Sequence, residues 1–298
     1  MCTLLVLLGP TGIGKTDLSI SLAQYFNAPV ISSDSRQIYR EMKIGTAVPD
    51  IAQLAVVHHY FVGARSIHDD YTAGKYETDV LDLLNGLFPR HPYVCLVGGS
   101  GLYIDAVCRG IDAIPATSES VRQKLIERLE NEGLESLRFE LKRLDPDIFD
   151  IIDVKNPKRV LRALEVCLTA GKPYSQLRSN FSKVRDFRIL KIGLQISRDE
   201  LYSRINYRVD LMIEQGLLDE AKQLYPYRHL NALKTVGYKE LFEYFDGQTS
   251  LDEAIELIKR NTRHYAKRQI SWFARYSDIE WFSPLDINKI IQYVNSKA

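Results

Sequence analysis

Residues 4–16 read LLVLLGPTGIGKT, an apolar run that leads into a glycine-rich loop ending in lysine and threonine. The loop Gly9-Pro10-Thr11-Gly12-Ile13-Gly14-Lys15-Thr16 has the spacing G-x-x-x-x-G-K-[ST], and the residues after it suit a helix. Its glycines let backbone N–H groups point at a phosphate, and the helix adds its positive N-terminal end. Lys15 supplies a charge, and the Thr16 hydroxyl suits a magnesium ion. The stretch therefore predicts a strand–loop–helix unit that binds a di- or triphosphate.

The composition is that of an ordinary globular protein. The 298 residues are 45% hydrophobic and 26% charged, with a net charge of +1, and could form one large or two modest domains. No apolar run approaches the roughly 20 residues that a membrane helix needs. The apolar start runs into the phosphate loop, so we expect no signal peptide. The scattered cysteines, without a C-x-x-C pair, favour a reducing cytoplasm over a disulfide or zinc framework.

Short apolar runs alternate with helical patterns, which predicts an α/β fold with a parallel sheet flanked by helices. The predicted strands are 4–8, 29–33, 93–97 and 189–196, with a weaker one at 279–282. The predicted helices are 16–26, 73–88, 102–109, 198–215, which stops at Gly216, and 250–276, which starts at the cap Ser250.

The segment 118–185 breaks this alternation. It reads as consecutive helices over 118–131 and 134–144, followed by one that starts at Asn156-Pro157. We interpret it as a mainly helical insertion domain, which leaves 1–117 and 186–298 as the catalytic core with its C-terminal helices.

Positive charge gathers in two runs. Residues 155–191 hold ten basic against two acidic residues, and residues 259–276 hold six basic residues, several aromatic residues and no acid. Basic residues among aromatics suit phosphate neutralisation and base stacking. For either run alone, a solvated helix face over a packed stripe is an equal alternative. Two such runs in a near-neutral chain, beside a phosphate loop, favour RNA or DNA as a partner.

Candidate catalytic groups follow the predicted strands. Asp34 comes just after the second strand, so it should face the same crevice as the phosphate loop, where it could accept a proton or hold magnesium. The alternative is that it caps the next helix. Glycines and Ser100 follow the third strand, and no acid closes it, which counts against a standard ATPase.

Arg204 and Arg208 lie four residues apart, on one face of a predicted helix. They could clamp a diphosphate, or they could pair with Glu200 or Asp210 at the surface. Arg159 and Arg162 lie three apart and could present a two-arginine phosphate contact. The adjacent His58 and His59 would point to opposite faces of an extended segment, so we do not expect them to share a metal ion.

In order and spacing, the chain resembles the tRNA dimethylallyltransferases, also called tRNA isopentenyltransferases, over nearly its full length. The matching segments are 9–16 (GPTGIGKT), 33–39 (SDSRQIY), 44–47 (IGTA), 58–59 (HH), 71–73 (YTA), 98–103 (GGSGLY), 159–165 (RVLRALE), 236–240 (VGYKE) and 263–269 (RHYAKRQ). Three positions depart from the family pattern. Ser100 replaces a threonine, Lys158 stands where glutamine is usual, and Val48 stands where a lysine is usual.

The resemblance implies transfer of a dimethylallyl group from dimethylallyl diphosphate to N6 of adenosine 37, in tRNAs that read codons beginning with U. The loop 9–16 would then hold the donor's diphosphate rather than ATP. Lys15, a Mg²⁺ ion near Thr16, and Arg204 or Arg208 would neutralise the leaving group. Asp34 would position the adenine amine and take its proton, and Ser100 would hydrogen-bond nearby.

The resemblance also implies contacts with the tRNA anticodon stem-loop, gripped by the insertion domain. The residues assigned to tRNA are Asp34, Ser35, Arg36, Gln37, Ser100, Arg122, Lys158, Arg159 and Arg162. We expect a cytoplasmic monomer without membrane contact. Two other classes share the loop and Asp34, an adenylate isopentenyltransferase and a P-loop small-molecule kinase. The insertion and the basic C-terminal helix favour tRNA over either, and a pure RNA-binding module would not need the loop and Asp34 together.

Overall fold

A computed structural model describes residues 2–112, 114, 118–178 and 182–297. Its centre is a six-stranded parallel sheet with the strand order β3-β2-β4-β1-β5-β6. The strands are β1 (Thr3–Leu8), β2 (Val30–Ser32), β3 (His59–Tyr60), β4 (Tyr93–Gly98), β5 (Arg188–Leu194) and β6 (Ile279–Phe282). The predicted α/β class is confirmed. The edge strand β3 escaped the sequence analysis because two residues carry no readable pattern.

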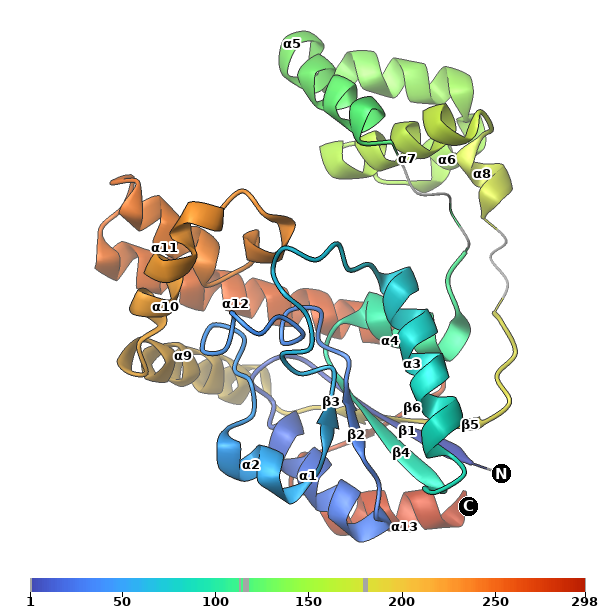
Figure 1. The fold of residues 1–298 in the computed structure, drawn as a ribbon, viewed down its shortest axis with the longest axis vertical. Coiled ribbons are helices and arrows are strands. Elements are labelled where there is room, and N and C mark those ends of the chain that lie inside the picture. Colours follow the sequence, from blue (N-terminus) through green and yellow to red (C-terminus); the bar gives the residue numbers. More distant parts are fainter. Residues whose placement is uncertain (1, 113, 115–117, 179–181, 298) are drawn as a thin grey trace. The chain divides into compact units, whose positions relative to one another are not determined.

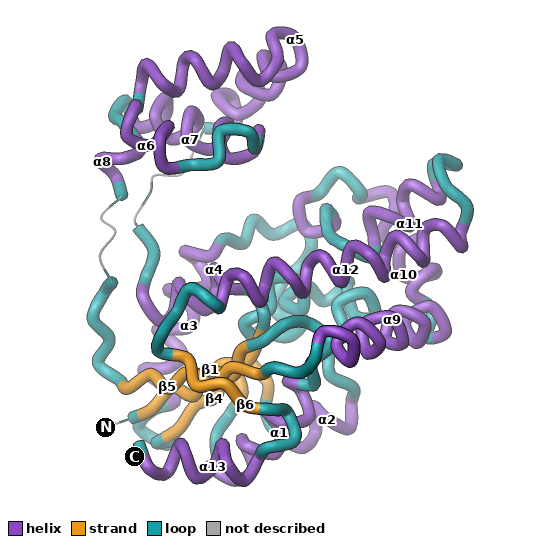
Figure 2. The backbone as a smooth tube through the Cα atoms, turned by 180° about the vertical axis from the view of Figure 1, so that it is seen from behind, coloured by secondary structure: helices purple, strands orange, loops and turns teal. Residues whose placement is uncertain are grey.

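Helices cover both faces of the sheet (Figures 1 and 2). In β1, Leu5 and Leu7 pack with one set of helices, and Leu4, Val6 and Leu8 pack with another. The first set includes α1 (Lys15–Phe26) and α13 (Ile287–Ser296), and the second includes α3 (Ala73–Leu87) and α4 (Gly101–Arg109). Alternate residues of a strand face opposite sides, so a strand covered on both sides must be apolar throughout.

A third apolar cluster joins helices from the second half of the chain to residues 38–42. Its helices are α9 (Arg198–Glu214), α10 (Leu217–Leu224), α11 (Tyr238–Phe245) and α12 (Leu251–Phe273), with the 3₁₀ turns η1 (Tyr225–Tyr227) and η2 (Asn231–Leu233) between them. Ser250 caps α12 with a capping box to Glu253, as predicted, and α12 ends three residues earlier than expected. Gly216 has φ +98°, which agrees with the predicted stop after α9. The short α2 (Ile51–Val56) precedes β3.

Residues Arg109–Lys183 form a separate compact unit, and Met1–Cys108 with Val184–Ala298 form the other. The sequence predicted this insertion at 118–185. The compact unit begins nine residues earlier than predicted, at Arg109, and ends two residues earlier, at Lys183. Its helices are α5 (Glu119–Leu144), α6 (Pro146–Ile151), α7 (Pro157–Ala170) and α8 (Tyr174–Leu177). Gly133, at φ +79°, breaks α5 where two separate helices were predicted. Leu125, Leu137 and Leu164 are among the residues of its own small core.

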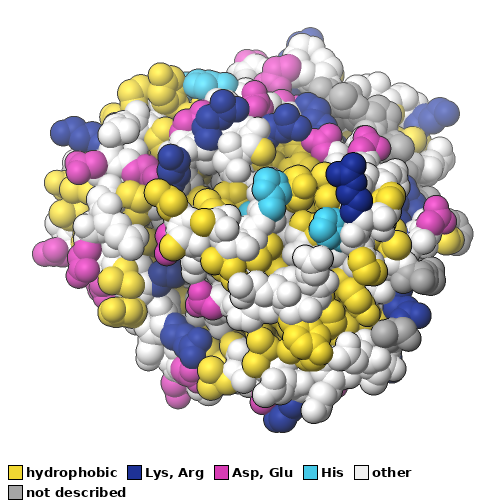
Figure 3. Space-filling view, turned by 60° about the horizontal axis from the view of Figure 1, so that its bottom comes forward, with side chains coloured by type: hydrophobic (Ala, Val, Ile, Leu, Met, Phe, Trp, Pro, Cys, Tyr) yellow, Lys and Arg dark blue, Asp and Glu magenta, His cyan; other side chains and the backbone are white. Residues whose placement is uncertain are grey.

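On the face shown in Figure 3, basic side chains stand among acidic and apolar ones rather than in one block. No helix among the described residues is long and apolar enough to cross a membrane.

Candidate active site

The phosphate loop joins β1 to α1 and is packed against α9. Gly12 and Gly14 have φ values of +82° and +96°, in the left-handed region that favours glycine. A Cβ atom on Gly12 would lie 2.9 Å from Cγ1 of Ile205 in α9. Gly12 is thus required by its backbone conformation and by the lack of space for a Cβ atom, and Gly14 is required by its conformation. These two glycines let the loop curl above the first turn of α1.

Two enclosed cations lie at this loop. The Nζ of Lys15 donates to the carbonyl oxygens of Gly9 and Pro10 at 2.9 and 2.8 Å. Burial and the nearby Arg208 lower the pKa of Lys15 to about 7, although Asp34 opposes the shift. Arg208 donates to the Thr11 hydroxyl at 2.6 Å, and burial lowers its pKa as well. Two cations in one poorly solvated place favour a multiply charged anion as their ligand.

The structure distinguishes Arg204 from Arg208. Arg204 forms an ion pair with Glu200 at 2.7 Å and reaches the Ile13 carbonyl at 3.4 Å. Asp210, the other expected partner, pairs with Lys259 at 2.8 Å instead. Both arginines therefore reach the phosphate loop, Arg204 at Ile13 while it is also paired with Glu200, and Arg208 at the Thr11 hydroxyl.

Asp34 follows the end of β2 and borders two cavities. Its Oδ1 accepts hydrogen bonds from the backbone N–H groups of Arg36 at 2.8 Å and Gln37 at 3.3 Å. These bonds close a turn over residues 35–38 and cap no helix, since the next helix is α2, which is capped by Asp50, so the helix-capping alternative is wrong. Because both bonds use Oδ1, the carboxylate can hold its turn and still present Oδ2 to a substrate.

Ser100 links the ends of β4 and β2. Its hydroxyl accepts the Ser35 N–H at 2.9 Å and lies 3.2 Å from the Ser35 hydroxyl. Burial raises the pKa of Tyr265 of α12 to about 12, and the nearby Ser100 hydroxyl opposes the shift. A protonated tyrosine and the Ser35 residue that Ser100 holds therefore border the smaller cavity beside Asp34.

The two cavities meet at the predicted catalytic residues. The larger, about 1090 Å³, is lined by the phosphate loop, by residues 43–54 and by the turn after β4. The smaller, about 490 Å³, is lined by residues 34–36, by the 234–240 segment and by the α12 face that carries Tyr265 and Arg268. Thr11, Asp34 and Arg208 border both. The larger cavity therefore offers a site for an anion at the phosphate loop, and the smaller cavity offers a site for a second ligand. The Asp34 carboxylate borders both.

Gln37, expected at tRNA, has its partners within the protein. Its Nε2 donates to the carbonyl oxygens of Thr46 and Ala47 at 3.1 and 2.9 Å, and its Oε1 accepts from Ser32 at 3.2 Å. In this structure its side chain supports the wall of the larger cavity.

Glu220 supports the same wall and was missed by the sequence analysis. Its carboxylate accepts the backbone N–H groups of residues 43, 44 and 45 at 2.8–2.9 Å and the Tyr238 hydroxyl at 2.7 Å. A Cβ atom on Gly45 would lie 2.6 Å from that hydroxyl. The match of residues 44–47 to the family pattern was the available signal, but nothing in the sequence pointed to a partner about 175 residues away.

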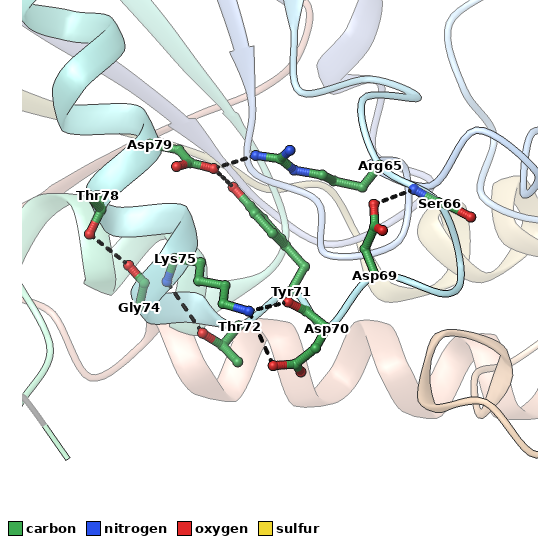
Figure 4. A network of polar contacts seen from close by, with 10 residues as sticks. All are labelled: Arg65, Ser66, Asp69, Asp70, Tyr71, Thr72, Gly74, Lys75, Thr78 and Asp79. Atoms are coloured by element: carbon green, nitrogen blue, oxygen red, sulfur yellow. Dashed lines mark hydrogen bonds and ion pairs between the residues drawn. The ribbon is translucent and has the colours of Figure 1, made fainter. Parts of the chain in front are cut away.

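The segment before α3 is held by the polar network in Figure 4. Asp79 accepts from Arg65 at 2.7 Å and from the Tyr71 hydroxyl at 2.8 Å, and the Arg65 guanidinium stacks over the Tyr71 ring. The backbone of Arg65 in turn bonds to that of Ile38 and Arg40. The network thus braces the chain that follows Asp34.

The predicted tRNA contacts of the insertion lie on α5 and α7. Arg122, Lys158, Arg159 and Arg162 are all exposed. Arg122 and Arg162 each lie 3.6 Å from an oxygen of Glu165, a carboxylate that is 3% exposed. One buried acid therefore gathers two exposed arginines.

Among the described residues, no three His, Cys, Asp or Glu side chains lie close enough to hold an ion. The His59 Nδ1 hydrogen-bonds to the Val57 carbonyl, and the His58 ring packs on Tyr60. Thr16 lies in the first turn of α1, with Lys15 at the helix start.

Comparison with known proteins identifies the family. Residues 37–276 match the model of the family described as IPP transferase. The chain belongs to this family. It is 53% identical to tRNA dimethylallyltransferase 1 of Phocaeicola vulgatus over 99% of this chain and 98% of that one. The tRNA isopentenylpyrophosphate transferase structure from Bacillus halodurans is 35% identical, with a TM-score of 0.73 over 100% of this chain and 97% of that one.

A third relative extends the comparison to eukaryotes. The structure of a eukaryotic dimethylallyltransferase acting on tRNA is 27% identical, with a TM-score of 0.78 over 100% of this chain and 77% of that one. The predicted family and the predicted transferase activity in tRNA modification are thereby confirmed.

Proposed function

We propose that this protein transfers the dimethylallyl group of dimethylallyl diphosphate to N6 of adenosine 37, in tRNAs that read codons beginning with U. The observation that carries the proposal is the meeting of two cavities at Asp34, with the enclosed cations Lys15 and Arg208 on the loop side. The names of the relatives supply the donor class and the RNA class.

The larger cavity receives the donor. Its diphosphate lies on the phosphate loop, where backbone N–H groups, Lys15 and Arg208 meet negative charge. Apolar residues of the 43–54 segment, with Leu211 and Met212 of α9, face the prenyl chain. These walls exclude water from the allylic carbon as it becomes cationic.

The smaller cavity receives the target adenine, turned out of its stack. The N6–C1 bond forms as the C1–O bond breaks, the electron pair of that bond leaves with diphosphate, and Asp34 takes the proton released by N6. Ser100 and Tyr265 orient the amine through their hydroxyls. Arg204, which pairs with Glu200 and donates to the Ile13 carbonyl, adds a further positive charge at the loop.

Mg²⁺ fits the oxygen donors near the loop. The Thr16 hydroxyl and the Asp34 carboxylate are ligands of the hard type that Mg²⁺ prefers, and this ion commonly keeps several waters beside substrate phosphates. When bound, it neutralises charge on the leaving diphosphate.

The insertion binds the anticodon stem-loop through Arg122, Lys158, Arg159 and Arg162, with Ser35 and Arg36 nearer the base. We infer a monomer as the working unit, since a single chain lines both cavities. We assign the activity to the cytoplasm, where four unpaired thiols would remain reduced.

The test is mass spectrometry of nucleosides after incubation with dimethylallyl diphosphate and an anticodon stem-loop. We expect a gain of one dimethylallyl group at adenosine 37, none with guanosine at that position, and none on free AMP. Modification of AMP with no modification of RNA would instead identify an adenylate isopentenyltransferase, and consumption of ATP would identify a kinase.

A further inference from the structure

Gln269 of α12 bridges two loops at the active edge of the sheet. Its side chain is 5% exposed, and both ends of its amide are used. Oε1 accepts the backbone N–H of Thr11 at 2.9 Å, and Nε2 donates to the carbonyl of Gly99 at 2.9 Å. Thr11 belongs to the loop after β1 and Gly99 to the turn after β4, the neighbouring strand. The Gln269 side chain therefore links the phosphate loop to the turn that carries Ser100.

Two glycines make room for α12 at this point. A Cβ atom on Gly99 would lie 2.2 Å from Nε2 of Gln269, and one on Gly101 would lie 2.3 Å from the indole of Trp272. Trp272 then donates its Nε1–H to Asp105 at 3.0 Å. The two glycines of the turn after β4 therefore let α12 pack closely against it, and Gln269 points toward the phosphate loop.

The bond to Thr11 has a consequence for Lys15. The Thr11 N–H and the Pro10 carbonyl belong to one planar peptide unit, so they turn together. Gln269 holds the N–H end, and Lys15 donates to the carbonyl end at 2.8 Å. Rotation of this peptide would break both bonds. Arg208 donates to the Thr11 hydroxyl at 2.6 Å, so Lys15 and Arg208 contact the neighbouring residues Pro10 and Thr11.

We propose that Gln269 is a positioning residue that fixes the Pro10–Thr11 peptide and thereby sets Lys15 and Arg208 for the donor's diphosphate. Because Tyr265 lies one turn earlier on α12 and borders the smaller cavity, the same helix also forms part of the acceptor side. The inference rests on the proposed function in that it takes the loop's ligand to be the diphosphate of the donor.

The decisive variant is Gln269→Met, which keeps the length of the side chain and removes both hydrogen bonds. We expect the KM for dimethylallyl diphosphate to rise about tenfold, and the affinity for inorganic diphosphate, measured by calorimetry, to fall about equally. The kcat and the affinity for the stem-loop should each change by less than about threefold, because the hydrogen bonds of Gln269 go to Thr11 and Gly99 rather than to Asp34.

The matched control is Gln292→Met, an exposed glutamine on α13, which should change none of these quantities. Gly99→Ala should reproduce the Gln269→Met defect, since its methyl group displaces Nε2. In a Gln269→Ala background the same glycine substitution should cost less, because the clash with Nε2 is then removed and only the Gly9 carbonyl, 3.1 Å from the new Cβ, stays close. Such non-additivity is the signature of direct contact.

A folded Gln269→Met protein that binds inorganic diphosphate like the wild type would overturn the proposal. So would an equal loss of diphosphate and stem-loop binding. If Gln269→Met does not fold, Gln269→Asn decides by the same measurements, since its shorter amide cannot span both loops. If the wild type fails to modify tRNA while Gln269→Met still loses diphosphate affinity, the proposed function fails and the loop argument stands.

Discussion

The helices α12 and α7 both carry basic residues of the two positively charged runs, but the surroundings of these residues differ. In α12, Lys259 pairs with Asp210, Arg263 donates to Asn206 at 2.6 Å, and Tyr265 and Gln269 face the catalytic loops. In α7, Lys158 and Arg159 are exposed, as is Arg162 beside Glu165. The α12 run therefore contributes Tyr265 and Gln269 to the active site and also exposes Arg260, Lys267, Arg268 and Arg275, whereas the α7 run is a charged surface.

The difference lies in what each helix packs against. α12 lies against the active edge of the sheet and α9, so the polar side chains on that face, such as Arg263 and Gln269, find partners inside the core unit. α7 packs one face against α5 and turns the other to solvent. We therefore expect changes near the sheet edge to alter donor use or rate, and changes on α7 to alter RNA capture and its salt dependence.

The largest expected effect comes from Asp34→Asn. Asparagine can keep the turn that Oδ1 makes with Arg36 and Gln37, but it cannot take a proton. We expect the single-turnover transfer rate to fall by about 10³, with stem-loop affinity within about threefold of the wild type. If tRNA binding collapsed while bound RNA was still modified at a normal rate, the assigned role of Asp34 would be wrong.

Next comes Lys15→Met, which removes a cation from the donor side. Loss of a charge-assisted contact should raise the KM for dimethylallyl diphosphate roughly 10- to 100-fold and leave stem-loop affinity unchanged. Steady-state kinetics with each substrate varied in turn give the answer. An equal rise in the KM for both substrates would contradict the expectation that changes near the sheet edge alter donor use while changes on α7 alter RNA capture.

Lys15 also predicts a pH dependence. Its pKa in the free protein is lowered to about 7, and binding of an anion requires the ammonium form. Above pH 7 the free protein has lost this proton, so diphosphate affinity should fall by up to about tenfold per pH unit. Calorimetry from pH 6 to 9 on the wild type and Lys15→Met separates this from ionisation of the ligand. Parallel curves for the two proteins would contradict the assignment.

Arg159→Ala should act through RNA alone. We expect a stem-loop affinity about three- to tenfold weaker, a salt slope reduced by about one, and an unchanged kcat. Arg138→Ala is the control, an arginine of the same unit that is paired with Glu135 on α5. Filter binding across a salt series measures both, and identical slopes in all three proteins would show that α7 is not the RNA surface.

The smallest effect on binding should come from Arg263→Ala on α12. It removes the bond to Asn206, so the free energy of unfolding should fall by about 1 kcal/mol. Its salt slope for the stem-loop should match that of the wild type, as followed by urea unfolding and filter binding. A lowered slope would mean that α12 contributes to the RNA surface after all.

The sequence by itself determined the phosphate loop, the α/β class, the helical insertion and the family, because these depend on local spacing and on patterns of apolar residues. Gly9–Thr16 carries its chemistry in eight consecutive residues, and Asp34 follows a readable strand. The capping of α7 by Asn156 and of α12 by Ser250 was equally local.

Tertiary structure decided which polar groups meet. The pair of Arg204 with Glu200 is local, at a spacing of four residues, but only the tertiary structure brings Arg204 to Ile13 and Arg208 to Thr11. Gln269 and Glu220 act on loops that lie far from them in the sequence. Side-chain contacts across such separations depend on how the helices pack on the sheet, and no local pattern encodes them.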